Sequence, residues 1–145
     1  MTSSPITIHP TINTVDTSTG RQGEEIVFRF LKYEHPNEHV EWMNAKQESG
    51  RPYDIRIRRN NQFEFIEVKT TRIHDQHTFQ ISIEEIEYLC QYPDHYHIYR
   101  VYYSDEPNST KIAIIPKVSY HLEKKQIPLC MTIIQQDDER TVEIS

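Results

Sequence analysis

One stretch of nineteen residues, 53–71, constrains the fold more than any other part of the chain. From Tyr53 to Arg59 apolar and polar side chains alternate with a period of two, which is the pattern of a half-buried strand. Asn60 and Asn61 follow, and asparagine tolerates the left-handed backbone of a tight turn. A second strand pattern then runs from Gln62 to Thr71. The sequence therefore predicts an antiparallel hairpin.

The second arm of this hairpin carries an acid and a base inside a largely apolar strand. Glu67 and Lys69 are two residues apart, so they project to one face of the strand while Val68 projects to the other. Pairing about the asparagine turn places Asp54 roughly opposite residue 67. A charged side chain in such a strand needs a partner or a function. We therefore expect the Asp54 and Glu67 carboxylates to converge.

The remaining patterns indicate a mixed α/β order. An apolar stripe at helical spacing predicts a helix from Thr19 to about Tyr33, capped by Ser18 or Thr19. A second helix is expected from a Ser82 cap to about Gln91. Further strands are expected at 39–43, 95–103, 111–115 and 129–134, and a short helix at 118–125. This order predicts an α/β sandwich with a central mixed sheet flanked by helices.

Length and composition fit one folded domain. The chain has 145 residues, with 36% hydrophobic and 26% charged side chains, which lies in the range of a single globular domain. We expect a flexible N-terminal arm at 1–18, a single domain at 19–134, and an acidic tail or edge segment at 135–145. No apolar run approaches the length of a membrane span, so no membrane partner is expected.

Charge and cysteine usage bear on the compartment and the partner. The formal net charge is −6, which counts against a general nucleic-acid binder, but residues 51–72 hold six bases against three acids. A local basic face on an acidic protein therefore stays open. Cys90 and Cys130 belong to no CxxC pair, and the N-terminus lacks the pattern of a secretory signal. We expect free thiols and an intracellular protein, cytoplasmic or nuclear.

Two converging carboxylates would form a hard oxygen site suited to Mg²⁺ or Mn²⁺. Such a metal binds a phosphate oxygen, lowers the pKa of its water and stabilises developing charge. An adjacent Lys69 can orient or activate the attacking water. Glu24 lies at the edge of the buried stripe of the first helix and can add a third carboxylate. The alternative is a cross-strand Lys–Glu pair on an ordinary sheet, which Glu-x-Lys alone does not exclude.

Several blocks in order resemble the NO VEIN C-terminal domain family. The resemblance runs from about Thr19 to Asn108 and rests on GRQGEEIVFRFL (20–31), VEWMN (40–44), ESGRPYDIRI (48–57), FIEVKTT (65–71) and YHIYRVY (96–102). That family is regarded as a relative of the PD-(D/E)XK nucleases. The resemblance therefore implies a restriction-endonuclease-like core of order α-β-β-β-α-β.

By this resemblance, Asp54 matches the metal-binding aspartate of the nuclease motif, Glu67 its second acid and Lys69 its lysine. Glu24 matches the acid often found on the first helix of the fold. One departure is that Pro52 stands two residues before the aspartate, where the motif usually has proline directly before it. The missing adjacent proline has no role in the chemistry.

The function implied by the resemblance is a metal-dependent nuclease that hydrolyses phosphodiesters in DNA or RNA, with Mg²⁺ or Mn²⁺ as cofactor. Nucleases of this fold often dimerise, so a homodimer or a larger complex is a further expectation. The alternative is a catalytically inactive nuclease-fold module that binds nucleic acid or a protein partner. The same four residues would then be retained without turnover.

Other polar residues are weaker candidates. Those considered for contact with nucleic acid are Arg56, Arg58, Arg72, Thr70 and Thr71, with solvated surface arginines as the alternative for the first two. Ser82 and the two threonines are candidates for supporting the site by hydrogen bonds. The pairs His74 with His77 and His95 with His97 lack a zinc-like spacing and are expected to be loop histidines. Arg100 either pairs with a buried acid or reaches the site.

Overall fold

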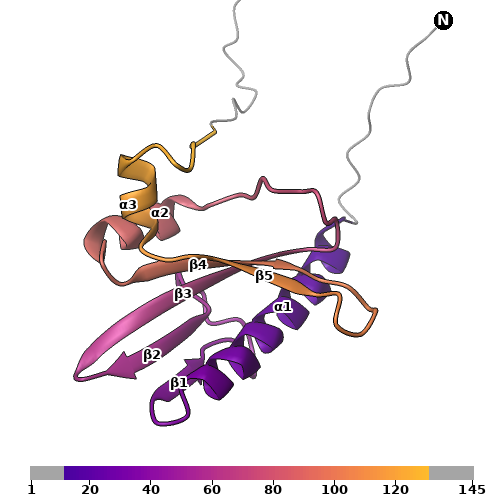
Figure 1. The fold of residues 1–145 in the computed structure, drawn as a ribbon, viewed down its shortest axis with the longest axis horizontal. Coiled ribbons are helices and arrows are strands. Elements are labelled where there is room, and N and C mark those ends of the chain that lie inside the picture. Colours follow the sequence, from indigo (N-terminus) through magenta and orange to yellow (C-terminus); the bar gives the residue numbers. More distant parts are fainter. Residues whose placement is uncertain (1–11, 131–145) are drawn as a thin grey trace, which may run out of the picture.

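The fold is built around one open β-sheet (Figure 1). The computed structural model describes the backbone of residues 12–130 and the side chains of residues 18–130. In chain order the elements of this part are α1 (Ile12–Glu34), β1 (His39–Trp42), β2 (Ile55–Arg59), β3 (Gln62–Thr71), α2 (Ile83–Gln91), β4 (Tyr96–Tyr102), β5 (Lys111–Ile115) and α3 (Val118–Glu123). Most of the expected strand 129–134, the acidic tail and most of the expected arm lie outside these residues.

The five strands of the sheet follow the order β1-β2-β3-β4-β5. Every neighbouring pair is antiparallel except β3 and β4, which are parallel. A parallel pair needs a crossover connection, and α2 supplies it. Figure 1 shows α1 on one side of the sheet and α2 with α3 on the other. The expected mixed sheet flanked by helices is therefore confirmed.

The hairpin of β2 and β3 forms as the sequence predicts. Ile55 pairs with Ile66, and Arg59 pairs with Gln62 across the turn. Asn60 and Asn61 both have positive φ, 46° and 65°, which is the backbone that a two-residue hairpin turn requires. The turn thereby fixes the register of the two arms.

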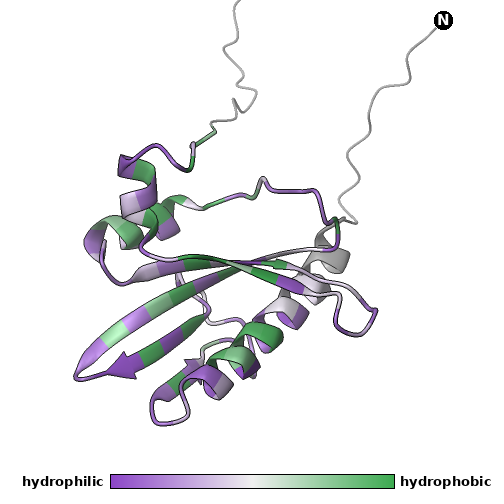
Figure 2. Cartoon of the chain, in the orientation of Figure 1, coloured by the Kyte–Doolittle hydropathy of each residue, from purple (hydrophilic) through white to green (hydrophobic). Residues whose placement is uncertain are grey.

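Side chains of the sheet form two separate cores, one on each face. Figure 2 shows apolar and polar residues interleaved along β3. The core on the α1 side consists of Val27, Leu31, Ile55, Ile57, Ile66, Val68 and Val101. The core on the α2 and α3 side consists of Tyr53, Phe65, Leu89, Tyr96, Ile98 and Val118. Adjacent residues of β3 enter opposite cores, so Glu67 lies on the α2 side as expected.

One expectation about the first arm is wrong. Tyr53 was expected on the same face as Ile55, but it packs in the α2 core, with its ring centroid 4.8 Å from that of Phe65. The strand begins only at Ile55, and the chain bends at Asp54. The period of two holds only within a strand, so it does not extend back to Tyr53.

The start of the first helix also differs from the prediction. α1 begins at Ile12, so neither Ser18 nor Thr19 caps it. Thr19 is buried, and its hydroxyl accepts a hydrogen bond from Arg72 Nε at 3.1 Å. The first turns are rich in polar and β-branched residues, so they lack the apolar stripe that identifies a helix from sequence.

Gly23 sets how closely α1 approaches β3. A Cβ atom at this position would lie 1.8 Å from Oγ1 of Thr70, and no side-chain adjustment removes an overlap of that size. Helix and strand therefore touch at the point where α1 also carries Glu24.

The predicted α2 is confirmed together with its cap. Ser82 accepts a hydrogen bond from the Glu85 amide, and the Glu85 side chain accepts one from the Ser82 amide, which completes a capping box. β1, β4, β5 and α3 lie within two residues of their expected bounds. No helix of residues 12–130 is long and apolar enough to cross a membrane.

Candidate active site

Asp54 lies at the entrance to β2, directly before the strand begins. Its amide donates to the carbonyl of Ile66 at 2.9 Å, which extends the hairpin pairing by one step. Oδ2 of Asp54 accepts a hydrogen bond from the Val68 amide at 2.8 Å. The carboxylate is therefore held against β3 beside Glu67, in the register that the sequence predicts.

Glu67 and Lys69 point from β3 towards α2. Nζ of Lys69 lies 3.1 Å from Oε1 of Glu67 and 3.1 Å from Oε2 of Glu85, a residue of α2. Glu67 and Glu85 keep only 9% and 6% of their surface exposed. One lysine therefore joins two buried glutamates, so this is no solvated pair on an ordinary sheet.

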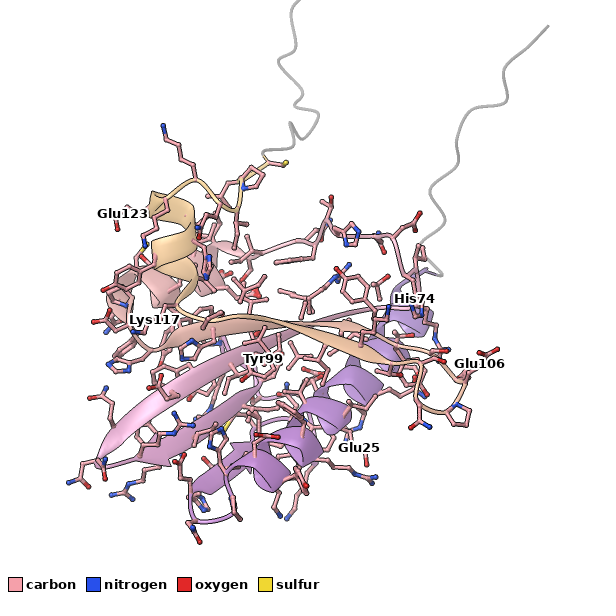
Figure 3. The ribbon with its side chains drawn as sticks, in the orientation of Figure 1. Glu25, His74, Tyr99, Glu106, Lys117 and Glu123 are labelled. Atoms are coloured by element: carbon pink, nitrogen blue, oxygen red, sulfur yellow. The ribbon has the colours of Figure 1, made fainter. Side chains whose placement is uncertain are left out.

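Glu24 comes from α1 and is also buried, as its place at the edge of the stripe predicts. Its Oε1 accepts hydrogen bonds from Asn44 Nδ2 at 2.7 Å and from Trp42 Nε1 at 3.3 Å. The same Asn44 nitrogen donates to Oδ1 of Asp54 at 2.9 Å. Glu24 and Asp54 are thus linked through one amide. The neighbouring Glu25, labelled in Figure 3, lies towards solvent on α1.

A polar cavity of about 470 Å³ opens over this part of the sheet. Its lining comes from the loop before β2, from the hairpin and from the start of α2: Glu48, Gly50, Arg51, Pro52, Asp54, Glu67, Ser82, Glu84 and Glu85. Asp54, Glu67 and Glu85 line the cavity, whereas Glu24 and Lys69 are not among its lining residues. Among residues 18–130, no three His, Cys, Asp or Glu side chains are already arranged to hold a metal ion.

Burial and the charge of a neighbouring carboxylate raise the pKa of Asp54 and of Glu67. For Asp54 burial is the larger cause and the nearby Glu24 carboxylate adds to it, while the Val68 amide acts in the opposite direction. For Glu67 burial again comes first, followed by the charge of Asp54, and Lys69 offsets only part of the increase. The two acids therefore resist being ionised together unless a further positive charge comes close.

For Lys69 and Glu85, the effect of the partner's charge on the pKa outweighs that of burial. Burial lowers the pKa of Lys69, but the Glu67 and Glu85 carboxylates more than reverse this, so its pKa is raised. Burial raises the pKa of Glu85, yet Lys69 and the hydrogen bonds from Lys69 and Ser82 bring it below the usual value. Lys69 is consequently a fixed cation at neutral pH.

Two residues of this site were absent from the sequence prediction. Glu85 has a complete local explanation as the third residue of a capping box, which conceals its contact with Lys69. Asn44 follows β1 in an irregular segment, and its partners Glu24 and Asp54 are ten or more residues away. Only the spatial closeness of α1, β1 and the hairpin reveals either role.

Two of the three arginines expected to contact nucleic acid already pair with acidic side chains of the protein. Arg56 pairs with Glu41 across the β1–β2 ladder, and its guanidinium lies 4.7 Å from the centre of the Phe63 ring. Arg72 bonds Thr19, Gln22 and Asp105. Arg58 is exposed and contacts only Asn61 at 3.4 Å among the described side chains. Of the three arginines, Arg58 is thus the most available to a phosphate.

The supporting hydroxyls divide into two groups. Ser82 donates its hydroxyl to Oε2 of Glu85 at 3.0 Å and so supports the site as expected. Thr71 donates to the Gln76 side chain, and Oγ1 of Thr70 is buried against α1 with no hydrogen-bond partner among residues 18–130. The two threonines therefore do not contact the acids.

Arg100 was expected either to pair with a buried acid or to reach the site, and it does neither. It is buried on β4, with Nη2 donating to the carbonyls of Gln76 at 2.6 Å and Thr78 at 3.3 Å. Its guanidinium lies over the rings of Phe79 and Tyr102. Arg100 thus holds the segment between β3 and α2 in place.

The histidines fall into two kinds. His74 lies in the loop after β3 (Figure 3), and His77 contacts the Tyr102 hydroxyl. His97 is not a loop residue, because it belongs to β4 and is largely buried. Both His95 and His97 contact the carboxylate of Glu64, at 3.2 and 2.8 Å. Cys90 is a free, exposed thiol, as expected.

Comparison with known proteins places the chain in a family. Residues 23–115 match the model of the family described as "Protein NO VEIN, C-terminal". The chain belongs to the NO VEIN C-terminal family. The matched residues contain all four acids of the site together with Asn44 and Lys69.

Two relatives from Arabidopsis thaliana show the same kinship. Protein NO VEIN is 35% identical over 85 residues, which is 57% of this chain and 3% of that protein. Protein NO VEIN-LIKE is 33% identical over 85 residues, which is 57% of this chain and 13% of that protein. The chain therefore corresponds to a small part of these relatives. No solved structure matches it significantly.

Proposed function

We propose that this NO VEIN domain is a metal-dependent nuclease that hydrolyses phosphodiester bonds in DNA or RNA. The observation that supports it best is an excess of acid. Four carboxylates, those of Glu24, Asp54, Glu67 and Glu85, form one cluster with a single lysine, and three of them line an open cavity. Isolated buried charges are strongly disfavoured, so a divalent cation would complete such a cluster.

The donor set fits Mg²⁺ or Mn²⁺. All the candidate ligands are carboxylate oxygens, which these hard cations prefer. Each oxygen of Asp54 accepts one hydrogen bond from the protein. A carboxylate oxygen accepts two, so each retains capacity for a metal. Asp54 and Glu67 would hold the ion from the cavity wall, and Glu24 would complete the set from α1.

When bound, the ion would polarise a phosphate oxygen and lower the pKa of a coordinated water. The residues of this chain would contribute charges held in fixed positions. Lys69 stays protonated between Glu67 and Glu85, so it would orient the attacking water and stabilise negative charge on the phosphate rather than remove a proton. Glu85 would fix the lysine in that position.

The element order supports a restriction-endonuclease-like arrangement for this reaction. The helix, three strands, helix and strand from α1 to β4 follow the expected α-β-β-β-α-β order, with Asp54 directly before the second strand and Glu67 on the third. Nucleic acid would enter over the cavity, and Arg58 on the hairpin is a candidate phosphate contact.

One observation favours a second candidate function. Lys69 is already engaged with two glutamates, and such an ion-paired arrangement could persist in a domain without turnover. The alternative is thus an inactive module that binds nucleic acid or a protein partner.

Cleavage assays separate the two. Purified protein is incubated with single- and double-stranded DNA and RNA, in Mg²⁺ or Mn²⁺ and in EDTA. We expect metal-dependent cleavage that Lys69→Ala abolishes while circular dichroism and thermal unfolding stay cooperative. Lys124→Ala, at an exposed lysine after α3, is the matched control and should cleave normally. Binding of nucleic acid without cleavage of any substrate would favour the inactive module.

A further inference from the structure

Asn44 occupies the centre of the contact between α1, β1 and the hairpin. It is buried, with 4% of its surface exposed. Its Nδ2 donates to Glu24 at 2.7 Å and to Asp54 at 2.9 Å, so one hydrogen is available for each acid. Its Oδ1 accepts from the Ser49 amide at 2.9 Å. Both the nitrogen and the oxygen of the side-chain amide therefore have hydrogen-bond partners.

These partners fix which way the amide points. In the reversed orientation, the oxygen of Asn44 would face the Glu24 and Asp54 carboxylates and its nitrogen would face the Ser49 amide. Every one of these contacts would then be repulsive. The donor side must consequently face the acids.

The backbone at Asn44 is also held from α1. Nη1 of Arg21 donates to the Asn44 carbonyl at 2.8 Å, and Nη2 donates to the Ala45 carbonyl. The same guanidinium lies 5.1 Å from the centre of the Trp42 ring. The amide is thus presented from a rigid support, and it connects the acids to the loop that rims the cavity.

We propose that Asn44 is a positioning residue that sets the separation of the Glu24 and Asp54 carboxylates for a shared divalent cation. This inference rests on the proposed function. An uncharged double donor suits the task, since it draws two acids together without neutralising them. A lysine here would compete with the metal, an aspartate would add to the repulsion, and a serine has only one hydrogen to donate.

Asn44→Ala and Ser49→Pro separate the two sides of this amide. The first variant removes both donors to the acids, whereas the second leaves these donors in place and removes the loop N–H that reaches Oδ1, together with the Ser49 hydroxyl that accepts from the Arg51 amide. Mn²⁺ affinity is measured by calorimetry as a function of pH. We expect Asn44→Ala to weaken binding by about 10-fold or more, the usual effect of losing a partner that orients a ligand. The pH midpoint of binding should also rise, because the lost hydrogen bond to Asp54 favoured its ionised form.

Ser49→Pro should retain the affinity and the pH midpoint of the unmodified protein. Equal weakening in both variants would overturn the inference, since it would assign Asn44 to the loop alone. Unchanged binding in Asn44→Ala would also overturn it. If that variant fails to fold, Asn44→Ser, which keeps one donor in a small polar side chain, takes its place. Asn44→Ser should bind Mn²⁺ more weakly than the unmodified protein, and equal binding would count against the inference.

Failure of the metal proposal is a distinct outcome. If the unmodified protein binds no Mn²⁺, the proposed function fails, and a double-mutant cycle of Asn44→Ala with Glu24→Gln on thermal unfolding decides the positioning claim. Non-additive effects support a direct link between the two side chains, and additive effects overturn it.

Discussion

Two polar clusters lie along β3 and β4, and they differ in how their charges are balanced. Near the start of β3, Glu64 is the single acid and contacts His95 and His97. Further along, the acids Asp54, Glu67 and Glu85 share one lysine. We call these the histidine cluster (Glu64, His95, His97) and the acid cluster (Glu24, Asp54, Glu67, Lys69, Glu85).

The histidine cluster is complete by itself. The Lys117 amide donates to Nδ1 of His97 at 2.8 Å, so Nε2 carries the proton and donates to Glu64 at 2.8 Å. Burial, which outweighs the opposing effect of Glu64, lowers the pKa of His97, and a neutral ring fits both contacts. Polar burial alone therefore does not indicate a functional site. The acid cluster differs because it brings together four carboxylates and only one lysine.

The largest expected difference is in metal binding. Asp54→Asn removes a charged ligand that faces the cavity, so it should weaken Mn²⁺ binding about 100-fold, or about 2.7 kcal/mol. Glu64→Gln, which alters the histidine cluster, should stay within about twofold, because that cluster offers a single carboxylate that already contacts His95 and His97. Calorimetry on both variants measures this contrast. Similar losses in the two would remove the distinction between the clusters.

A smaller difference concerns stability between pH 5 and 8 without metal. The raised pKa values of Asp54 and Glu67 mean that the folded protein binds more protons than the unfolded chain, so their contribution falls as pH rises. The lowered pKa of His97 has the opposite sign, and its contribution is lost as pH falls below about 6.5.

Glu67→Gln isolates the acid contribution. Without metal, the stability of this variant relative to the unmodified protein should be greater at pH 8 than at pH 5. The expected difference is about 1 kcal/mol in the free energy of unfolding, or roughly 4 °C in the thermal midpoint. Adding Mg²⁺ at pH 8 should raise the midpoint of the unmodified protein but not of the variant. Parallel pH curves for the two proteins would show that these acids titrate normally.

The smallest expected effect comes from Glu85→Gln. Glu85 acts on the site through Lys69 and remains bonded to Ser82, so Mn²⁺ binding should weaken only about threefold. Glu87→Gln on the exposed side of the same helix is the matched control and should leave binding unchanged. A loss as large as that of Asp54→Asn would instead make Glu85 a direct ligand.

The parts that could be predicted from sequence are those set by local signals. The asparagine turn and the period of two fixed the hairpin register, and this register placed Asp54 beside Glu67. The Ser82 cap was likewise recognised because its partner is three residues away. The start of α1 was missed because its first turns carry no apolar stripe.

The parts that could not be predicted depend on tertiary contacts. Asn44 acquires its role only when α1 and the hairpin meet on either side of it. Glu85 reaches Lys69 only because the crossover returns α2 over β3. Neither contact leaves a periodic pattern in the sequence. The family resemblance predicted from motifs is confirmed, whereas the nuclease activity stays a prediction.

Anomalous diffraction from a Mn²⁺-soaked crystal tests the central claim most directly. The excess of acid predicts one strong peak or a close pair of peaks in the cavity, within coordination distance of Asp54 and Glu67 and with Glu24 turned towards the ion. The histidine cluster should show none. A fully loaded crystal with no peak beside Asp54, or with the only peak beside Glu64 and His97, would contradict the account.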